Sequence, residues 1–306
     1  MKRKIVQHGN STLSLSLPSK WVKSNNIQKG QFLNIDIAER GLVISQEKIK
    51  FSSIEINLSN EKEWYINRIL SHLYTYGFDE IKINYTEQKQ LSLIRKMLAE
   101  LTGFEIVESN PKYCIIKAVA SIDTIEFDNN IKRILFQILS QFDYFIEDIE
   151  KKSYSNFDET LEIHKVVTKL INLSKRLINK NLVFGKNTSK YAYNFLIGLL
   201  NISRSIIYSY KYAKTNNSKL NEIESNLIKK TRDFYQELMG AYQNQDMIKI
   251  KSFLDERETI SEDSLEILKE KNPVVIHFFL DMFKEFSAIS NFVIILNTNR
   301  ENKTEN

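Results

Sequence analysis

From residue 126 to residue 296, apolar residues recur every three or four positions, and this spacing is the strongest constraint on what the chain can fold into. The first such stripe consists of Ile131, Ile134, Leu135, Ile138, Leu139, Phe142, Phe145, Ile146 and Ile149. Similar stripes occupy residues 161–178, 195–210, 220–242, 248–254 and 274–296. Because a helix with one apolar stripe must bury it against other helices, the sequence predicts an antiparallel α-helical bundle with short connections.

Residues 51–125 have a different rhythm, which predicts a compact α/β domain. Strands are expected at 53–58, 79–85, 104–109 and 113–119, and helices at 61–77 and 87–103, with a glycine at each helix end. The element order is βαβαββ. No glycine-rich loop leads from a strand into a helix, so nothing here supports a nucleotide phosphate site. Cys114 is the single cysteine and is expected in the core.

The first fifty residues alternate with a period of two, as half-buried strands do. In residues 11–17, Leu13, Leu15 and Leu17 alternate with Ser14 and Ser16. Pro18 suits the first turn of a short helix in "PSKWVKSNN", and "QFLNIDI" and "LVISQ" then predict a hairpin. A unit of this size has little core of its own, which favours pairing with a second copy.

Positive charge is concentrated in the same fifty residues. They contain nine Lys and Arg against three acidic residues, whereas the rest of the chain has 34 basic and 35 acidic residues. This distribution is expected of a segment that meets a polyanion, although solvated charge without a partner is an alternative. No signal-peptide pattern follows the basic start, and Asp281, Lys284 and Glu285 interrupt the most apolar helix, so we expect a cytoplasmic protein without membrane insertion.

Residues 4–46, "KIVQHGNSTLSLSLPSKWVKSNNIQKGQFLNIDIAERGLVISQ", resemble the swapped-hairpin DNA-binding domain of the AbrB and SpoVT type in its archaeal form. The likeness lies in the Gln-x-Gly-Asn-Ser approach, the Ser-Leu-Pro-Ser-Lys-Trp turn, the Lys-Gly before the third strand and the Gly-Leu-Val-Ile ending. It implies a small swapped-hairpin β-barrel in which two chains interleave, and therefore a homodimer that binds DNA.

Residues 66–139 are similar to the middle of archaeal phosphate uptake regulators, in which an AbrB-like head is fused to a PhoU-like helix bundle. The resemblance implies a multidomain α+β protein. Its expected parts are a DNA-binding and dimerisation domain at 1–50, the α/β domain at 51–125, a PhoU-like antiparallel α-helical bundle at 126–296 and a loose polar tail at 297–306.

The expected DNA-binding residues fall into two chemical groups. Basic side chains would meet phosphates, and short polar side chains would bond to phosphates or base edges. The basic group is Lys2, Arg3, Lys4, Lys20 and Lys23, and the polar group is His8, Asn10, Ser11, Ser14 and Ser16. For each serine taken singly, a plain solvent-facing strand is the alternative interpretation. Trp21 is expected to pack beside the barrel.

The resemblance to PhoU-like bundles also implies a metal site, because those bundles hold metal clusters with acidic residues four apart on inner helices. Such residues face the same way, and their oxygens suit a divalent or iron-type ion. Asp281 and Glu285 keep this spacing and are the candidate metal ligands. The matching half looks lost, since Asn201 and Ser205 stand there with Arg204 beside them. His164 and His277 are lone histidines and are not expected to be ligands.

The function expected from these features is a dimeric transcriptional regulator, linked by resemblance to phosphate uptake, whose bundle receives a signal or a partner protein. The alternative is a PhoU-like adaptor that regulates a phosphate transporter through protein contacts and uses the head to dimerise. An antitoxin-like repressor fits the head only. The chain is not expected to be an enzyme, because it has no nucleophile elbow, His-Glu-x-x-His motif or Walker loop.

Overall fold

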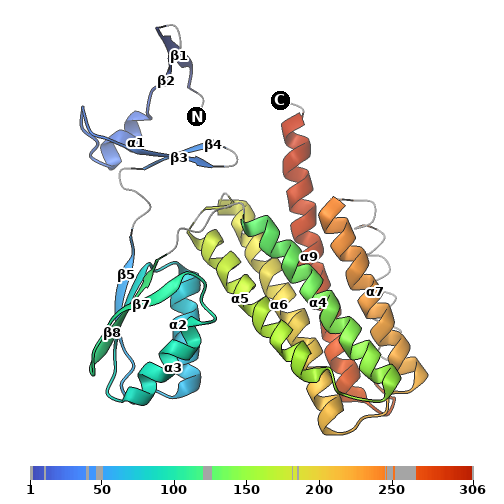
Figure 1. Ribbon diagram of the computed structural model, residues 1–306. Helices are drawn as coiled ribbons and strands as arrows, with labels where there is room; N and C mark the ends of the chain where they lie inside the picture. The colour runs from blue at the N-terminus through green and yellow to red at the C-terminus, as the bar shows by residue number, and fades with distance from the viewer. Residues whose placement is uncertain are drawn as a thin grey trace. The chain divides into compact units, whose positions relative to one another are not determined.

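The chain divides into two compact units, residues 1–51, here called the head, and residues 52–306, here called the body (Figure 1). The structure is a computed structural model that describes residues 3–9, 12–38, 41–45, 51–119, 126–180, 182–184, 186–244, 246, 251 and 267–304. Within these residues the fold is mixed α+β, with strands in the first 120 residues and helices after them. The α+β class expected from the sequence is therefore confirmed.

The head contains two separate hairpins with one short helix between them. β1 (Ile5–His8) pairs with β2 (Thr12–Leu15), and β3 (Asn34–Ala38) pairs with β4 (Gly41–Ser45), both antiparallel. The helix α1 (Ser19–Ser24) begins directly after Pro18, as predicted. Among the described residues no ladder joins the two hairpins, and the interleaved barrel remains a prediction about two chains.

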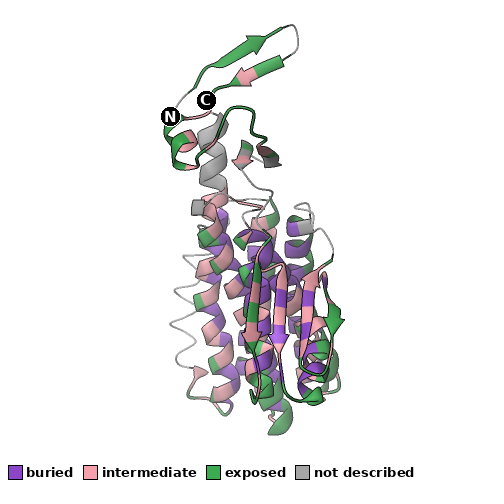
Figure 2. Cartoon of the chain, turned by 90° about the vertical axis from the view of Figure 1, so that its left-hand side faces the viewer, coloured by how far each residue is buried: buried purple, intermediate pink, exposed green. Residues whose placement is uncertain are grey.

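The head shows no core among the residues whose burial is described. None of these residues is buried, and several large apolar residues are exposed (Figure 2). Leu13 is 68% exposed and Leu15 is 53% exposed, although both alternate with polar neighbours as a half-buried strand would. Phe32 is 95% exposed. The alternation therefore marks an apolar face of the hairpin, and none of the described residues covers it.

The first part of the body is a four-stranded sheet with two helices. Its elements are β5 (Ser53–Asn57), α2 (Glu63–Tyr76), β6 (Glu80–Asn84), α3 (Gln88–Leu98), β7 (Phe104–Ser109) and β8 (Tyr113–Ala118). The strand order is β5-β6-β8-β7, with β5 parallel to β6 and the other pairs antiparallel. The predicted βαβαββ order is confirmed. The second helix ends at Leu98, earlier than predicted, and the left-handed Gly103 lies in the turn before β7.

The two faces of this sheet differ in polarity. Ile81, Ile83, Cys114 and Ile116 are buried and pack with apolar residues of α2 and α3, including Leu70. Most alternate positions are polar, although Ile115 is not, and two ion pairs form across strands. The Lys82 ammonium lies 3.1 Å from the Glu55 carboxylate, and the Lys117 ammonium lies 2.7 Å from that of Glu80. A two-layer arrangement follows, with helices on the apolar face and a polar outer face.

The rest of the body is a helix bundle built from α4 (Glu126–Lys151), α5 (Phe157–Asn179), α6 (Lys186–Thr215), α7 (Glu222–Asn244) and α9 (Pro273–Thr304). The predicted apolar stripes form one large core, in which Phe142, Phe195, Tyr210, Phe279 and Phe292 are fully buried. The stripe predicted at 248–254 falls almost entirely outside the described residues. The polar tail expected at 297–306 is helical as far as Thr304, where α9 ends.

Contacts between helices give their directions. The Tyr235 hydroxyl of α7 donates to the Leu135 carbonyl of α4, and Arg232 lies 2.9 Å from Asp143, so α4 and α7 are antiparallel. Asn201 and Ser209 of α6 bond to Glu285 and Val275 of α9, which makes that pair antiparallel too. The bundle is thus largely antiparallel, as predicted, with α6 between α5, α4 and α9.

Within the described residues, no helix combines the length and the apolar character that a membrane crossing requires.

One glycine limits which residue can end α2. Gly77 has φ +114°, and a Cβ built there would lie 3.1 Å from Cγ of Lys180. We expect Gly77→Ala to lower the free energy of unfolding by about 1–3 kcal/mol because the left-handed backbone would be strained. The matched control is Gly240→Ala inside α7, where a Cβ would meet nothing within 4 Å. This substitution should raise the free energy of unfolding by about 0.5–1 kcal/mol. Urea denaturation of both variants checks the pair, and equal effects would contradict the argument.

Candidate functional site

The structure describes seven of the ten predicted DNA-binding residues, and Lys2, Asn10 and Ser11 lie outside the described residues. Arg3, Lys4, His8, Ser16, Lys20 and Lys23 are exposed, and Ser14 is half-buried. None of the charged members of this set forms an ion pair with any described residue. These basic groups are therefore open to an external anion.

The register of the first hairpin sorts its residues between two faces. Val6 lies opposite Ser14, and His8 lies opposite Thr12, so these four side chains share one face. Ile5 lies opposite Leu15, and Gln7 lies opposite Leu13, on the other face. The predicted polar contacts His8 and Ser14 are thus brought together, and the leucines point away from them.

The helix α1 places two lysines on one side. Lys20 and Lys23 are three residues apart, so their side chains lie on the same face. Lys23 is in the last turn, where its positive charge also suits the negative end of the helix. The helix is held at its C-terminal end by Asn25, whose backbone and side-chain nitrogens both donate to the Trp21 carbonyl, at 3.1 Å and 2.9 Å.

The predicted metal ligands on α9 are engaged by other side chains. The Lys284 ammonium lies 2.7 Å from Oδ1 of Asp281, and Nε2 of His277 lies 3.4 Å from its Oδ2. Oε1 of Glu285 accepts a hydrogen bond of 3.0 Å from the Asn201 amide. Among the described residues, no three His, Cys, Asp or Glu side chains gather as metal ligands would. Two carboxylates on separate partners do not fit a metal cluster.

The helix α6 contacts Glu285 of this pair. Asn201 bridges the two helices: its amide nitrogen donates to Glu285, and its amide oxygen accepts from Nη1 of Arg204 at 3.3 Å. A permanently charged guanidinium therefore stands one turn from the position where a metal ligand would be needed. At this position α6 therefore offers an amide and a fixed positive charge where a metal site would need carboxylates.

His164 belongs to a buried polar chain that crosses three helices. Its Nδ1 lies 2.8 Å from the Ser203 hydroxyl, which itself donates to Oε1 of Gln141 at 2.6 Å. Because the Ser203 hydroxyl donates its one proton to Gln141, it can only accept from His164, so Nδ1 of His164 is the donor. Burial, with the charge of Arg204 acting in the same direction, lowers the pKa of His164 to about 4. The ring is neutral and packs in the bundle.

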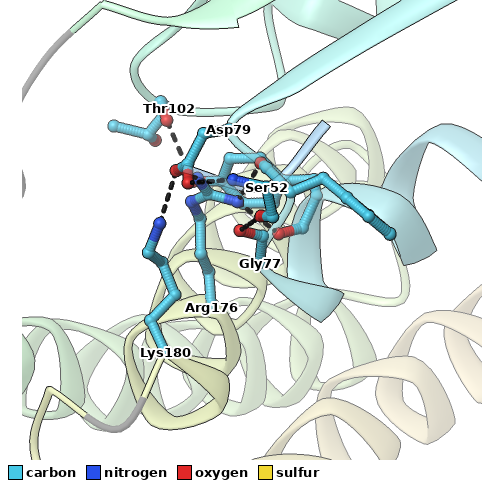
Figure 3. Close-up of polar contacts among 8 residues, drawn as sticks. Ser52, Gly77, Asp79, Thr102, Arg176 and Lys180 are labelled. Carbon is cyan, nitrogen blue, oxygen red and sulfur yellow. Dashed lines mark hydrogen bonds and ion pairs between the residues drawn. The ribbon is translucent and has the colours of Figure 1, made fainter. Parts of the chain in front are cut away.

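A second charged cluster joins the sheet layer to the bundle, and the sequence analysis did not identify it (Figure 3). Nη2 of Arg176 on α5 lies 2.8 Å from the Asp79 carboxylate, and the Lys180 ammonium contacts the same oxygen. Nη1 of Arg176 donates to the Phe78 carbonyl at 2.7 Å and the Tyr74 carbonyl at 2.9 Å. The Arg176 side chain is 3% exposed, so this ion pair is almost dry.

The same carboxylate also holds the first residue of the body. The Ser52 backbone N–H donates to Oδ2 of Asp79 at 3.2 Å, and the Ser52 hydroxyl donates to the Gly77 carbonyl at 3.1 Å (Figure 3). In return the Asp79 N–H donates to the Ser52 carbonyl at 2.7 Å. Helix α5 and the residue where the chain leaves the head are thus linked through one side chain.

One sequence signal could have identified the cluster. Arg176 stands inside the apolar stripe of residues 161–178, where a helix that only packs would carry an apolar residue. Lys180 follows four residues later on the same face. The carboxylate partner could not be found in this way, since Asp79 is nearly a hundred residues away and nothing local marks its contact.

We expect Asp79→Asn to destabilise the protein by about 3 kcal/mol, because the buried Arg176 would lose its counter-charge. The matched control is Asp143→Asn, which breaks a partly exposed pair with Arg232 and should change the stability by less than about 1 kcal/mol. Urea denaturation of the two variants measures the difference. Equal losses would mean that the burial of the Asp79 pair does not matter.

Comparison with known proteins leaves these sites without an assignment. The chain matches no protein-family model, and no curated protein or solved structure is significantly similar to it. A function is therefore argued from the charged groups of the body around Asp79 and Glu285, and from the cations and exposed apolar faces of the head.

Proposed function

We propose that the protein is a dimeric DNA-binding transcriptional regulator whose head contacts DNA and whose body receives a signal. The proposal rests on the state of the head: its hairpins have exposed apolar faces, none of the residues whose burial is described is buried, and its described cations pair with no described residue. A unit with these properties needs two partners. Apolar faces call for a second protein surface, and basic groups call for a polyanion.

A second copy of the chain is the occupant that fits the apolar faces. Ile5, Leu13 and Leu15 lie on one face of the first hairpin, and Ile35 with Ile44 lies on one face of the second. Both hairpins therefore present an apolar side to a partner. Two such heads can bury four faces in one shared core, which is what the resemblance to swapped-hairpin domains implies.

The charges support DNA as the second partner. In a dimer, Lys2, Arg3, Lys4, Lys20 and Lys23 occur twice, so ten cations would act on one duplex. These contacts would position the protein without regard to base sequence, whereas His8 and Ser14, which share a hairpin face, are the candidates for sequence readout. Small polar side chains on a strand permit close approach of the backbone to a groove.

The body supplies the place at which a signal would act. Its link to the head begins at Ser52, which is bonded to Asp79 and through it to α5. A ligand or partner that shifts the bundle must bind two arrangements of the protein unequally to change DNA affinity. The connection with phosphate uptake rests on the resemblance of residues 66–139 alone.

DNA affinity should fall steeply with salt. If about six cations of the dimer displace counterions, the logarithm of affinity changes with a slope of about −5 against the logarithm of salt concentration. The Lys20→Gln, Lys23→Gln variant removes up to four contacts per dimer and should flatten the slope by up to about 4. Fluorescence anisotropy on DNA from upstream of its own gene, with a scrambled control, measures both quantities.

The control for this variant is Lys132→Gln, an exposed lysine of α4 in the body, which should leave the slope unchanged. Weak binding with no preference between the two DNAs would contradict the regulator proposal. That outcome would favour the adaptor alternative, in which the head only dimerises and the body acts through protein contacts.

The dimer itself is tested by the apolar face of the first hairpin. We expect the protein to have twice the mass of one chain by light scattering coupled to gel filtration. Leu13→Ser with Leu15→Ser removes most of the apolar surface of that face and should shift the protein to the monomer. The control is Phe136→Ser on α4, an exposed residue of similar apolar character outside the head. A monomeric natural protein would contradict the proposal.

A further inference from the structure

One ridge of the helix α2 remains exposed on the body. It consists of Trp64, Arg68, His72 and Tyr76, which follow one another at intervals of four residues and are all exposed. Side chains four apart on a helix form a continuous ridge, so these four stand in one row about 18 Å long. Trp64 is 61% exposed and Tyr76 is 70% exposed. Both ends of the row are therefore large aromatic side chains in contact with water.

The other faces of α2 are covered by the body. Ile66 and Leu70 are fully buried in the core that α2 and α3 form with the sheet. A second face lies against α5, where the Asn179 amide donates to the Thr75 carbonyl at 2.7 Å. The ridge is therefore the face of α2 that remains for another molecule.

The contacts of the ridge are local. The Trp64 ring lies edge-on to that of Tyr65, with 5.8 Å between the centroids, and the Tyr76 ring stacks on that of Phe78 at 5.1 Å. Arg68 forms no ion pair with any other residue that the structure describes. The aromatic rings thus keep an open side, and the guanidinium is open to a carboxylate.

The residue types of the ridge and the charge of the helix layer point to an acidic protein partner. Trp, Tyr and Arg are the residues whose truncation most often weakens a protein interface. The helices α2 and α3, which cover one face of the sheet (Figure 1), contain one acidic residue, Glu63, and four basic ones. The basic residues are Arg68, Lys89, Arg95 and Lys96, and all four are exposed. This layer therefore favours a negatively charged partner.

Two other occupants fit the ridge less well. Two antiparallel copies of it would bring Trp64 against Tyr76 and Arg68 against His72, so no carboxylate would meet the guanidinium. A site for single-stranded nucleic acid follows the backbone with a row of cations, whereas the ridge carries one permanent cation. A helix whose apolar stripe is flanked by carboxylates matches both the rings and the charge, because ridges of one helix pack into the grooves of another.

We propose that α2 docks an acidic amphipathic helix of a partner protein, with Trp64 and Tyr76 as apolar anchors and Arg68 as the ion-pairing group. Apolar side chains of the partner cover the two rings, and its carboxylates face Arg68 and the cations of α3. Burial of the two aromatic rings supplies most of the affinity. The charges decide which amphipathic helices bind and how fast they associate.

The proposal goes beyond DNA binding and does not depend on it, because every residue that it uses lies in the body. It places the partner beside the residues that hold the start of the body. The carbonyl of Gly77, next to Tyr76, accepts from the Ser52 hydroxyl at 3.1 Å. The carbonyl of Phe78, whose ring stacks on Tyr76, accepts from Arg176 at 2.7 Å.

The experiment uses the full-length protein and a fluorescein-labelled synthetic helix of about 21 residues, in which three heptads carry a leucine stripe flanked by glutamates. A scrambled peptide of the same composition keeps the charge but loses the stripe. A second control peptide has lysine in place of every glutamate. By fluorescence anisotropy, we expect the acidic helix to bind at least about tenfold more tightly than either control peptide.

Variants of the ridge identify the surface that binds. Trp64→Ala and Arg68→Gln should each weaken binding of the acidic helix by about tenfold, whereas Trp64→Phe should keep most of it because an aromatic ring remains. The matched controls are Phe136→Ala and Arg133→Gln, which change an exposed aromatic residue and an exposed arginine of α4 and should bind as the natural protein does. Thermal unfolding checks that each variant is folded.

The proposal is overturned if the natural protein does not prefer the acidic helix to both control peptides, or if Trp64→Ala and Arg68→Gln bind it as tightly as the natural protein. Vesicles of anionic lipid and a single-stranded oligonucleotide are measured in parallel. If one of these binds through Trp64 and the acidic helix does not, the ridge has that ligand instead. DNA binding by the head is measured on other residues, so either proposal can fail while the other stands.

Discussion

The pairing of Arg176 with Asp79 is the interaction on which the body depends. The sheet layer and the helix bundle have separate apolar cores, so apolar burial within each does not by itself join them. The Arg176 guanidinium joins the two layers by bonding the Asp79 carboxylate and two carbonyls at the end of α2. It also lies 5.1 Å from the centroid of the Tyr74 ring and 4.9 Å from that of the Phe104 ring. Charge, hydrogen bonds and aromatic contacts thus meet in one side chain, which fixes the orientation of α5 on the sheet layer.

The sequence predicts most of the body because its signals are local. A period of three to four gives the helices, a period of two gives the strands, and Gly77 ends α2 where a left-handed residue is needed. The two wrongly predicted helix ends also come from reading local signals. Gly103 looks like a helix stop, but the preceding residues form a turn. The polar residues after Leu296 look loose, but α9 runs on to Thr304, and a helix end is the part of a helix that a local pattern fixes least well.

What the sequence could not give is the pairing of distant charges. Lys175 and Arg176 are neighbours on α5, and nothing in the local pattern shows that Arg176 pairs with Asp79 whereas Lys175 lies over the Tyr193 ring. The same limit applies to Glu285, because its partner Asn201 lies on the facing helix α6. Asp281 instead pairs with Lys284, three residues along the same helix, a contact that the local spacing allows.

The head differs from the body in how far the described residues cover its apolar and charged groups. Its leucine face is exposed, and the lysines of α1 pair with no described residue. The body, by contrast, buries its large apolar side chains in two cores. The proposal that a second copy and DNA complete the head rests on this contrast, because a chain that packs its body so fully leaves a leucine face exposed only where another molecule can cover it.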